Sequence, residues 1–142
     1  MQAVAFTAIA IREELKKFFI VALARQQRGE KTGMPSCYLD TFWHRIAENP
    51  KQYEQFCLEF VGTHALVDHL PYNGEGILEW VPEYEAQFGL LPSIWFTDLD
   101  GKVNVPMYDE YMETGTVRAS WNCGPALPPK ESGEVRNAMM CV

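Results

Sequence analysis

The chain has 142 residues, a formal net charge of −7 and a hydrophobic content of 47%. This length suits a single domain that buries a sizeable hydrophobic core. A surface this acidic repels phosphate backbones, so we expect no nucleic-acid partner.

Targeting and redox signals favour the cytoplasm. The apolar run at the N-terminus lacks the basic flank of a signal peptide, and no run reaches the roughly 18 apolar residues of a membrane span. The four cysteines, which form no C-x-x-C pair, are typical of free thiols in a reducing compartment; they are Cys37, Cys57, Cys123 and Cys141. We therefore expect a cytoplasmic protein without a membrane partner.

The N-terminal part of the chain predicts one long helix over residues 3–27. Leu15, Phe18 and Ala22 recur at the spacing that places side chains on one helical face. Residues 4–11 are apolar nearly all round, so this end of the helix is expected to be buried or to pack on another chain.

Two shorter helices follow. Ser36 or Asp40 is a suitable N-cap for the first of them, which ends at Asn49. Asn49-Pro50 then supplies a cap and a first-turn proline for the next helix, which ends at Gly62.

The second half of the chain shows mixed signals. Residues 63–76 predict a loop or a short helical turn, and residues 75–88 predict a helix interrupted at Pro82. Asp100-Gly101 lies between apolar runs and predicts a small hairpin near residues 94–105. Beyond Gly115 the periodicity fades into a segment rich in proline and glycine.

These elements predict a mainly α fold: a compact domain of about four helices with a small C-terminal β-hairpin and an irregular tail. Residues 1–115 would form the helical domain with its hairpin, and residues 116–142 the tail. A protein partner would bind through the N-terminal helix or through this tail.

The histidines and one cysteine suggest a metal site. We predict His44, Cys57 and His69 as ligands, because transition metals such as zinc, iron or copper bind imidazole and thiolate groups. Asp40 precedes His44 by one helical turn, so it would orient that histidine from outside the coordination sphere. The alternative is structural: Asp40 caps its helix, His44 bonds to it, and Cys57 is a small core residue.

Other chemistries have weaker support. A nucleophilic pair of Cys57 with His44 or His69 would need an activated thiol, whereas an apolar aromatic setting makes a thiol inert. Asp98 and Asp100 begin like a calcium loop, but the run lacks the closing glutamate at the required spacing. A hairpin turn explains them better.

Several short motifs occur in a fixed order along the chain. They are Pro35-Ser36, Asp40-x-x-Trp43-His44, Tyr53-x-x-Phe56-Cys57, His69-x-Pro71, Tyr84-x-x-x-Phe88-Gly89, and Pro92 followed by Ile94-Trp95. This pattern resembles small bacterial proteins akin to the plant glycine-rich domain-containing proteins, over roughly residues 15–96. The resemblance implies a compact, mainly helical domain and singles out His44, Cys57 and His69. It leaves His64 outside the pattern and implies no particular reaction.

Two functions are compatible with the sequence. The first is a small metal- or ligand-binding domain, in which an open coordination position would permit hydrolytic chemistry. The second is a non-enzymatic interaction module of adaptor or immunity type, in which Asp40 and His44 are structural. Metal content separates the two, because only the first function requires His44 and His69 as ligands. The sequence does not decide whether the protein is an enzyme.

Overall fold

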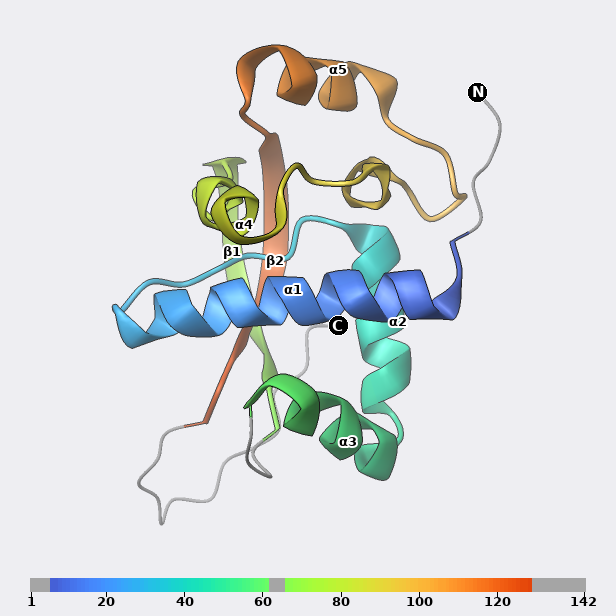
Figure 1. The fold of residues 1–142 in the computed structure, drawn as a ribbon, viewed down its shortest axis with the longest axis vertical. Helices are drawn as coiled ribbons and strands as arrows, with labels where there is room; N and C mark the ends of the chain where they lie inside the picture. Colours follow the sequence, from blue (N-terminus) through green and yellow to red (C-terminus); the bar gives the residue numbers. More distant parts are fainter. Residues whose placement is uncertain (1–5, 62–65, 129–142) are drawn as a thin grey trace.

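The computed structural model describes residues 6–61 and 66–128. Within them the chain forms five α-helices, one short 3-10 helix and a two-stranded antiparallel sheet (Figure 1), which confirms the mainly α prediction. The helices are α1 (Ala8–Gln27), α2 (Cys37–Ala47), α3 (Pro50–Val61), α4 (Val81–Phe88) and α5 (Val105–Thr114), with the 3-10 helix η1 at Ser93–Phe96. The strands are β1 (Asp68–Ile77) and β2 (Arg118–Ala126).

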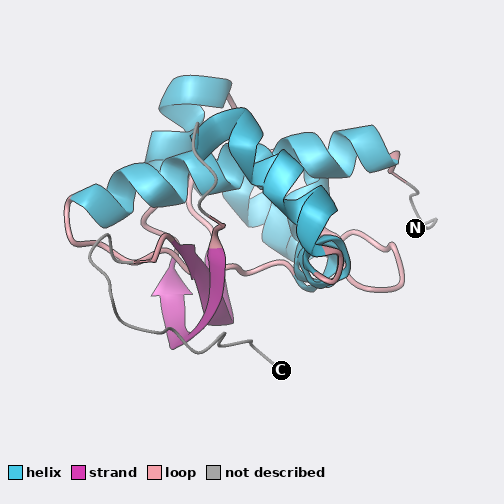
Figure 2. Cartoon of the chain, turned by 90° about the horizontal axis from the view of Figure 1, so that it is seen from below, coloured by secondary structure: helices cyan, strands magenta, loops and turns pink. Residues whose placement is uncertain are grey.

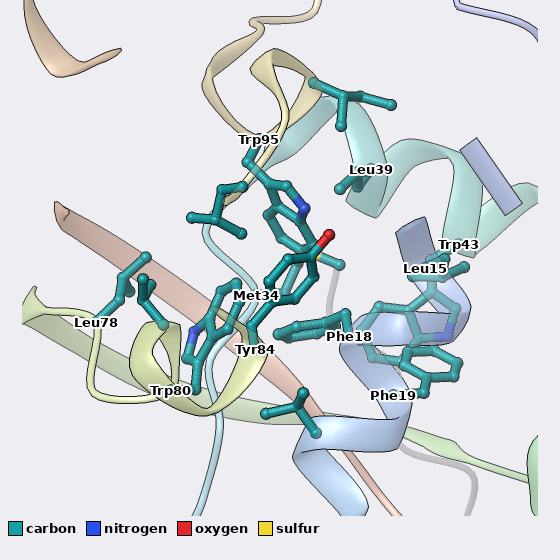
Figure 3. Packing of buried hydrophobic residues seen from close by; sticks show 14 of the residues in the cluster. Leu15, Phe18, Phe19, Met34, Leu39, Trp43, Leu78, Trp80, Tyr84 and Trp95 are labelled. Carbon is teal, nitrogen blue, oxygen red and sulfur yellow. The ribbon is translucent and has the colours of Figure 1, made fainter. Parts of the chain in front are cut away.

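Helix α1 supplies the centre of the core. Its N-terminus is capped by Thr7, whose side chain accepts a hydrogen bond from the amide of Ala10 at 3.0 Å. Phe18 and Phe19 are fully buried on one face of the helix. The ring of Phe18 lies 5.0 Å from that of Trp80, so α1 joins the segments around it into one aromatic core (Figure 3).

The boundaries of α2 and α3 follow the predicted capping residues. The hydroxyl of Ser36 accepts from the amide of Leu39 at 3.0 Å, so Ser36 rather than Asp40 is the N-cap of α2. The side-chain oxygen of Asn49 accepts from the amide of Gln52 at 3.1 Å at the start of α3. Asp40 is thereby left free for contacts beyond its own helix.

The sheet lies where the sequence predicts none. Strand β1 occupies residues predicted as a loop and the start of a helix, and β2 occupies the first part of the predicted tail, so these assignments are wrong. The register shifts between Pro71 and Gly74, where β1 carries an irregularity of the bulge type. Such an irregularity accommodates the proline and the Asn73-Gly74 pair, which otherwise signal a turn.

The segment predicted as a hairpin near residues 94–105 contains only one bridge of β type, between Thr97 and Val103. The expected turn is present, since the amide of Gly101 donates to the carbonyl of Asp98 at 2.9 Å. Asn104 then caps α5, a helix that the sequence analysis did not predict, with its side chain accepting from Met107 at 3.2 Å.

A buried carboxylate connects α1 to the second half of the chain. Glu14 is 8% exposed. It accepts hydrogen bonds from the Tyr84 hydroxyl at 2.5 Å and from the Trp95 indole at 3.1 Å, and Lys17 lies 3.2 Å away. These donors compensate for the desolvation of the carboxylate.

The sheet lies along one side of the helical layer, as Figure 2 shows from below. Strand β2 contacts α1, and η1 contacts both α2 and α5. None of the helices in residues 6–61 and 66–128 combines the length and the apolar character required to cross a membrane.

Candidate metal centre

Three side chains of metal-binding type converge where α2 meets the sheet. Ligand atoms of Asp40, His69 and Cys123 all lie within 4.8 Å of one another. Asp40 comes from α2, His69 from β1 and Cys123 from β2. The cluster therefore depends on the tertiary fold rather than on a local sequence motif.

The strand register brings His69 and Cys123 together. His69 pairs with Pro125, and Cys123 pairs with Pro71. Paired residues of an antiparallel ladder share a face, and so do residues two apart on one strand. His69 and Cys123 are therefore diagonal neighbours on the same face of the sheet.

Helix α2 supplies the carboxylate. Asp40 lies in the first turn, where the amide of Asp40 donates to the carbonyl of Ser36 at 2.8 Å. This position aims a negative charge at the sheet while keeping it near the positive end of the helix dipole.

Asp40 is the hub of the cluster. Its Oδ1 atom lies 2.8 Å from Nε2 of His69, and the Cys123 thiol donates to the same oxygen across 3.4 Å. His69 and Cys123 are 4% and 1% exposed, and the Asp40 side chain is 25% exposed. His69 and Cys123 are therefore shielded from solvent, and solvent reaches the cluster at Asp40.

The environment of Asp40 favours its charged form. Burial alone would raise the pKa of this carboxyl, but the contacts with His69, Cys123 and His44 outweigh it and hold the pKa below its usual range. Asp40 is therefore ionised at neutral pH and available as an oxygen ligand.

His44 lies beside the cluster. Its Nε2 atom is 3.5 Å from Oδ2 of Asp40, so the i, i+4 proximity expected from the sequence is present. The rings of His44 and His69 have centroids 4.2 Å apart. His44 thus contacts the carboxylate oxygen that does not face His69.

Trp43 holds His69 from another side. The two ring centroids are 4.0 Å apart with an interplanar angle of 82°. The Trp43 indole donates to the Tyr53 hydroxyl at 2.9 Å, and this hydroxyl donates to the carbonyl of Val67 at 2.7 Å. These two hydrogen bonds hold the Trp43 ring in place, and the imidazole of His69 packs against that ring.

Cys57, a predicted ligand, lies outside the Asp40–His69–Cys123 cluster among the described residues. It is fully buried on α3, and burial raises the pKa of its thiol despite hydrogen bonding to Val67 and Tyr53. These contacts are those of a core thiol. His64 lies outside the described residues.

Sequence reasoning missed Cys123 because it assigned residues 116–142 to an irregular tail. The Gly-Pro pair that follows Cys123 is a usual loop signal, and it led away from a strand. The residue types were the available signal. Cys123 and His69 are both of metal-binding type, and they would lie on one face of a sheet if the segments around them paired as strands.

The two donor distances that involve Asp40 are close to those of a metal site. Zinc–ligand bonds of about 2.0–2.3 Å in a tetrahedron place ligand atoms roughly 3.3–3.8 Å apart. The distances of 2.8 and 3.4 Å from Asp40 Oδ1 bracket the lower end of that range. Small rotations of these side chains would accommodate an ion.

A cavity of about 200 Å³ opens beside Asp40, the member of the cluster that lines it. It is bordered by Asp40, by Ser36 and Cys37 at the start of α2, and by Ser120 and Asn122 of β2. A small molecule that enters it approaches the carboxylate side of the cluster.

Comparison of the chain with protein-family models, curated proteins and solved structures finds no match. The resemblance to the glycine-rich domain-containing proteins therefore stays a prediction.

Proposed function

We propose that this protein is a small metal-binding protein that holds one transition-metal ion among Asp40, His69 and Cys123. The observation that carries the proposal is the convergence of an oxygen, a nitrogen and a sulfur donor from three separate elements within 4.8 Å. Zinc is the ion we favour, because its tetrahedral sites are built from carboxylate, imidazole and thiolate ligands; iron and copper are the alternatives.

Binding would change the protonation of the cluster. The Cys123 thiol now donates its hydrogen to Asp40. A metal ion requires the thiolate, so the thiol proton would leave to solvent as the sulfur–metal bond forms. Because the ionised Asp40 can only accept, the hydrogen between Nε2 of His69 and Oδ1 of Asp40 is on the imidazole. Binding through Nε2 would send this proton to Nδ1 of the same ring or to solvent. Asp40 would lose the hydrogen bond from the thiol and gain the metal in its place.

Three protein ligands leave a fourth position in a tetrahedral ion. The cavity beside Asp40 supports placing that position toward solvent, as in zinc sites that bind water. A metal lowers the pKa of bound water, so hydrolysis is the class of reaction that this arrangement supports. His44, which contacts the second oxygen of Asp40, would orient the carboxylate.

The test is a calorimetric titration of chelator-stripped, full-length protein with zinc in two buffers of different ionisation enthalpy. We expect one zinc per chain and the release of one or two protons, measured from the difference between buffers: one from Cys123 and a second if the proton of His69 leaves to solvent. His69→Ala should remove the signal, while Gln52→Ala on the outer face of α3 should preserve it. A wild-type protein that takes up no zinc, iron or copper would leave the cluster as a hydrogen-bonded part of the core.

A further inference from the structure

A second pocket lies apart from the metal cluster, between the end of α1, the segment that follows it and the paired strands. Its volume is about 610 Å³. This is within the range of about 300–1,000 Å³ that small-molecule sites occupy. The side chains that matter for its chemistry are Arg25, Lys31, Tyr72, Trp80, Arg118 and Trp121.

The tryptophans distinguish this pocket from the rest of the molecule. The chain has four, and two of their indole N–H groups have protein acceptors: Trp43 donates to Tyr53 and Trp95 donates to Glu14. The other two, Trp80 and Trp121, carry the buried side-chain polar atoms without a hydrogen-bond partner in the described part of the chain. Both of these tryptophans line the pocket.

Buried N–H groups without acceptors are rare, because each loses its hydration without compensation. Trp80 is only 2% exposed. Both residues line the same pocket, although their N–H groups are buried beneath its surface, so a ligand in this pocket would contact the rest of each indole ring.

The position of Trp121 is fixed by two glycines. A Cβ atom at Gly33 would lie 2.2 Å from Cγ of Trp121, and one at Gly74 would lie 2.6 Å from Cζ2. Neither distance is sterically allowed, so the indole fits only because both residues lack a side chain. The ring, and with it the direction of the N–H group, is held between the segment after α1 and the irregularity in β1.

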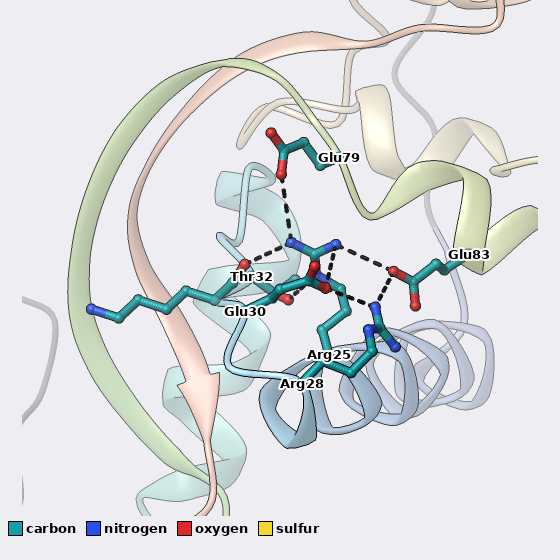
Figure 4. A network of polar contacts seen from close by, with 7 residues as sticks. Arg25, Arg28, Glu30, Thr32, Glu79 and Glu83 are labelled. Carbon is teal, nitrogen blue, oxygen red and sulfur yellow. Dashed lines mark hydrogen bonds and ion pairs between the residues drawn. The ribbon is translucent and has the colours of Figure 1, made fainter.

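The charges in the pocket favour an anion. Arg25 is already paired, with Glu83 at 3.3 Å, Glu30 at 3.6 Å and Glu79 at 3.9 Å (Figure 4). Lys31 and Arg118, by contrast, have no carboxylate within 4.0 Å among the described residues. The ammonium group of Lys31 instead lies 5.4 Å from the centre of the Tyr72 ring.

The acidic residues of the same pocket limit the charge of the ligand. Glu75 and Glu79 also line it. They would repel a multiply charged anion such as phosphate more strongly than a singly charged carboxylate. Tyr72 and the two indoles offer flat apolar surfaces for a planar body.

We propose that this pocket binds a small planar monocarboxylate. Its carboxylate pairs with Lys31 and Arg118, and its ring packs on the aromatic side chains, those of Trp80 and Trp121 among them. The proposal is independent of the metal centre, although Trp121 also borders the cavity beside Asp40.

The four indole N–H groups make a direct test. In ¹⁵N-labelled, chelator-treated full-length protein, each gives its own cross-peak, assigned by Trp→Phe variants. Titration with benzoate should shift the peaks of Trp80 and Trp121 saturably and leave those of Trp43 and Trp95 in place. Benzamide, which has the same shape without the charge, should bind at least about tenfold more weakly, since charged hydrogen bonds are the stronger ones.

Substitutions complete the test. Arg118→Gln and Lys31→Gln should each weaken benzoate binding at least about fivefold, whereas Arg45→Gln, on an exposed position of α2 outside the pocket, should not. Absence of any saturable shift, equal shifts from benzamide, or equal shifts of all four indoles would each overturn the proposal. Because the metal is removed throughout, failure here says nothing against the metal centre.

Discussion

The Nε2 atom of His69 lies 2.8 Å from Oδ1 of Asp40, although 29 positions separate the two residues. This contact joins the first strand to the first turn of α2. It places one imidazole nitrogen beside one carboxylate oxygen, and the Cys123 sulfur lies 3.4 Å from the same oxygen. The proposed ion would be bound by Asp40, His69 and Cys123 at this contact.

His69 and His44 should differ in their effect on metal affinity. His69→Ala removes a ligand and should abolish stoichiometric zinc binding. His44→Ala removes only a contact to the far oxygen of Asp40, so affinity should fall by about 10–100-fold. Competition with a chromophoric chelator measures both. Equal losses in the two variants would show that His44 is itself a ligand.

Cys57 should contribute to stability and not to metal binding. Cys57→Ser places a hydroxyl in a fully buried site and should lower the free energy of unfolding by about 1–3 kcal/mol, with zinc affinity unchanged. The exposed Cys37 provides the matched control, and Cys37→Ser should change stability by less than about 0.5 kcal/mol. Loss of zinc binding in Cys57→Ser would instead identify Cys57 as a ligand.

Glu14 should be a strong determinant of core stability. Glu14→Ala leaves the Tyr84 hydroxyl and the Trp95 indole without their acceptor, so the free energy of unfolding should fall by about 2–4 kcal/mol. Its neighbour Glu13 makes a partly exposed ion pair with Lys16, and Glu13→Ala should cost less than about 1 kcal/mol. Urea unfolding of the two variants gives the comparison, and similar values would refute the role of Glu14.

Tyr111 should make stability sensitive to alkaline pH. Burial and the hydrogen bond to Glu85 raise its pKa from 10.0 to about 12. Because the folded-state pKa is the higher one, the stabilisation is complete below about pH 10 and is lost as pH rises through about 12. Tyr111→Phe also removes the acceptor of the Leu91 amide.

The measurement is the difference in unfolding free energy between wild type and Tyr111→Phe. It should be about 1–3 kcal/mol near neutral pH and should narrow from about pH 10 upward. Tyr108→Phe, on the same helix, serves as the control. A difference that stays constant to about pH 12 would contradict the assignment.

The helices of the first half were predictable because their signals are local. Ser36, Asn49-Pro50 and the apolar stripe of α1 act within a few residues, and their capping bonds appear as expected. The pairing of β1 with β2 was not predictable in this way. Its ladder joins residues about 50 positions apart, and Pro71 and Gly124 interrupt the alternation that marks a strand.

The same distinction explains the candidate site. Asp40 and His44 share one helical face, so their proximity follows from spacing alone. The residue type of Cys57 is compatible with a metal ligand. Its burial in the core depends on how α3 packs, which the sequence does not show. Cys123 reaches Asp40 only through the strand register. The predicted partner surfaces, at the N-terminal helix and the tail, stay predictions.

The most direct test of the metal centre is the absorption spectrum of the protein titrated with cobalt(II), which replaces zinc and reports its ligands. We predict a thiolate-to-cobalt charge-transfer band in the near ultraviolet that saturates at one equivalent, persists in Cys57→Ser and disappears in Cys123→Ser. Cobalt binding without that band, or a band lost in Cys57→Ser and kept in Cys123→Ser, would contradict the assignment of Asp40, His69 and Cys123 as the ligands.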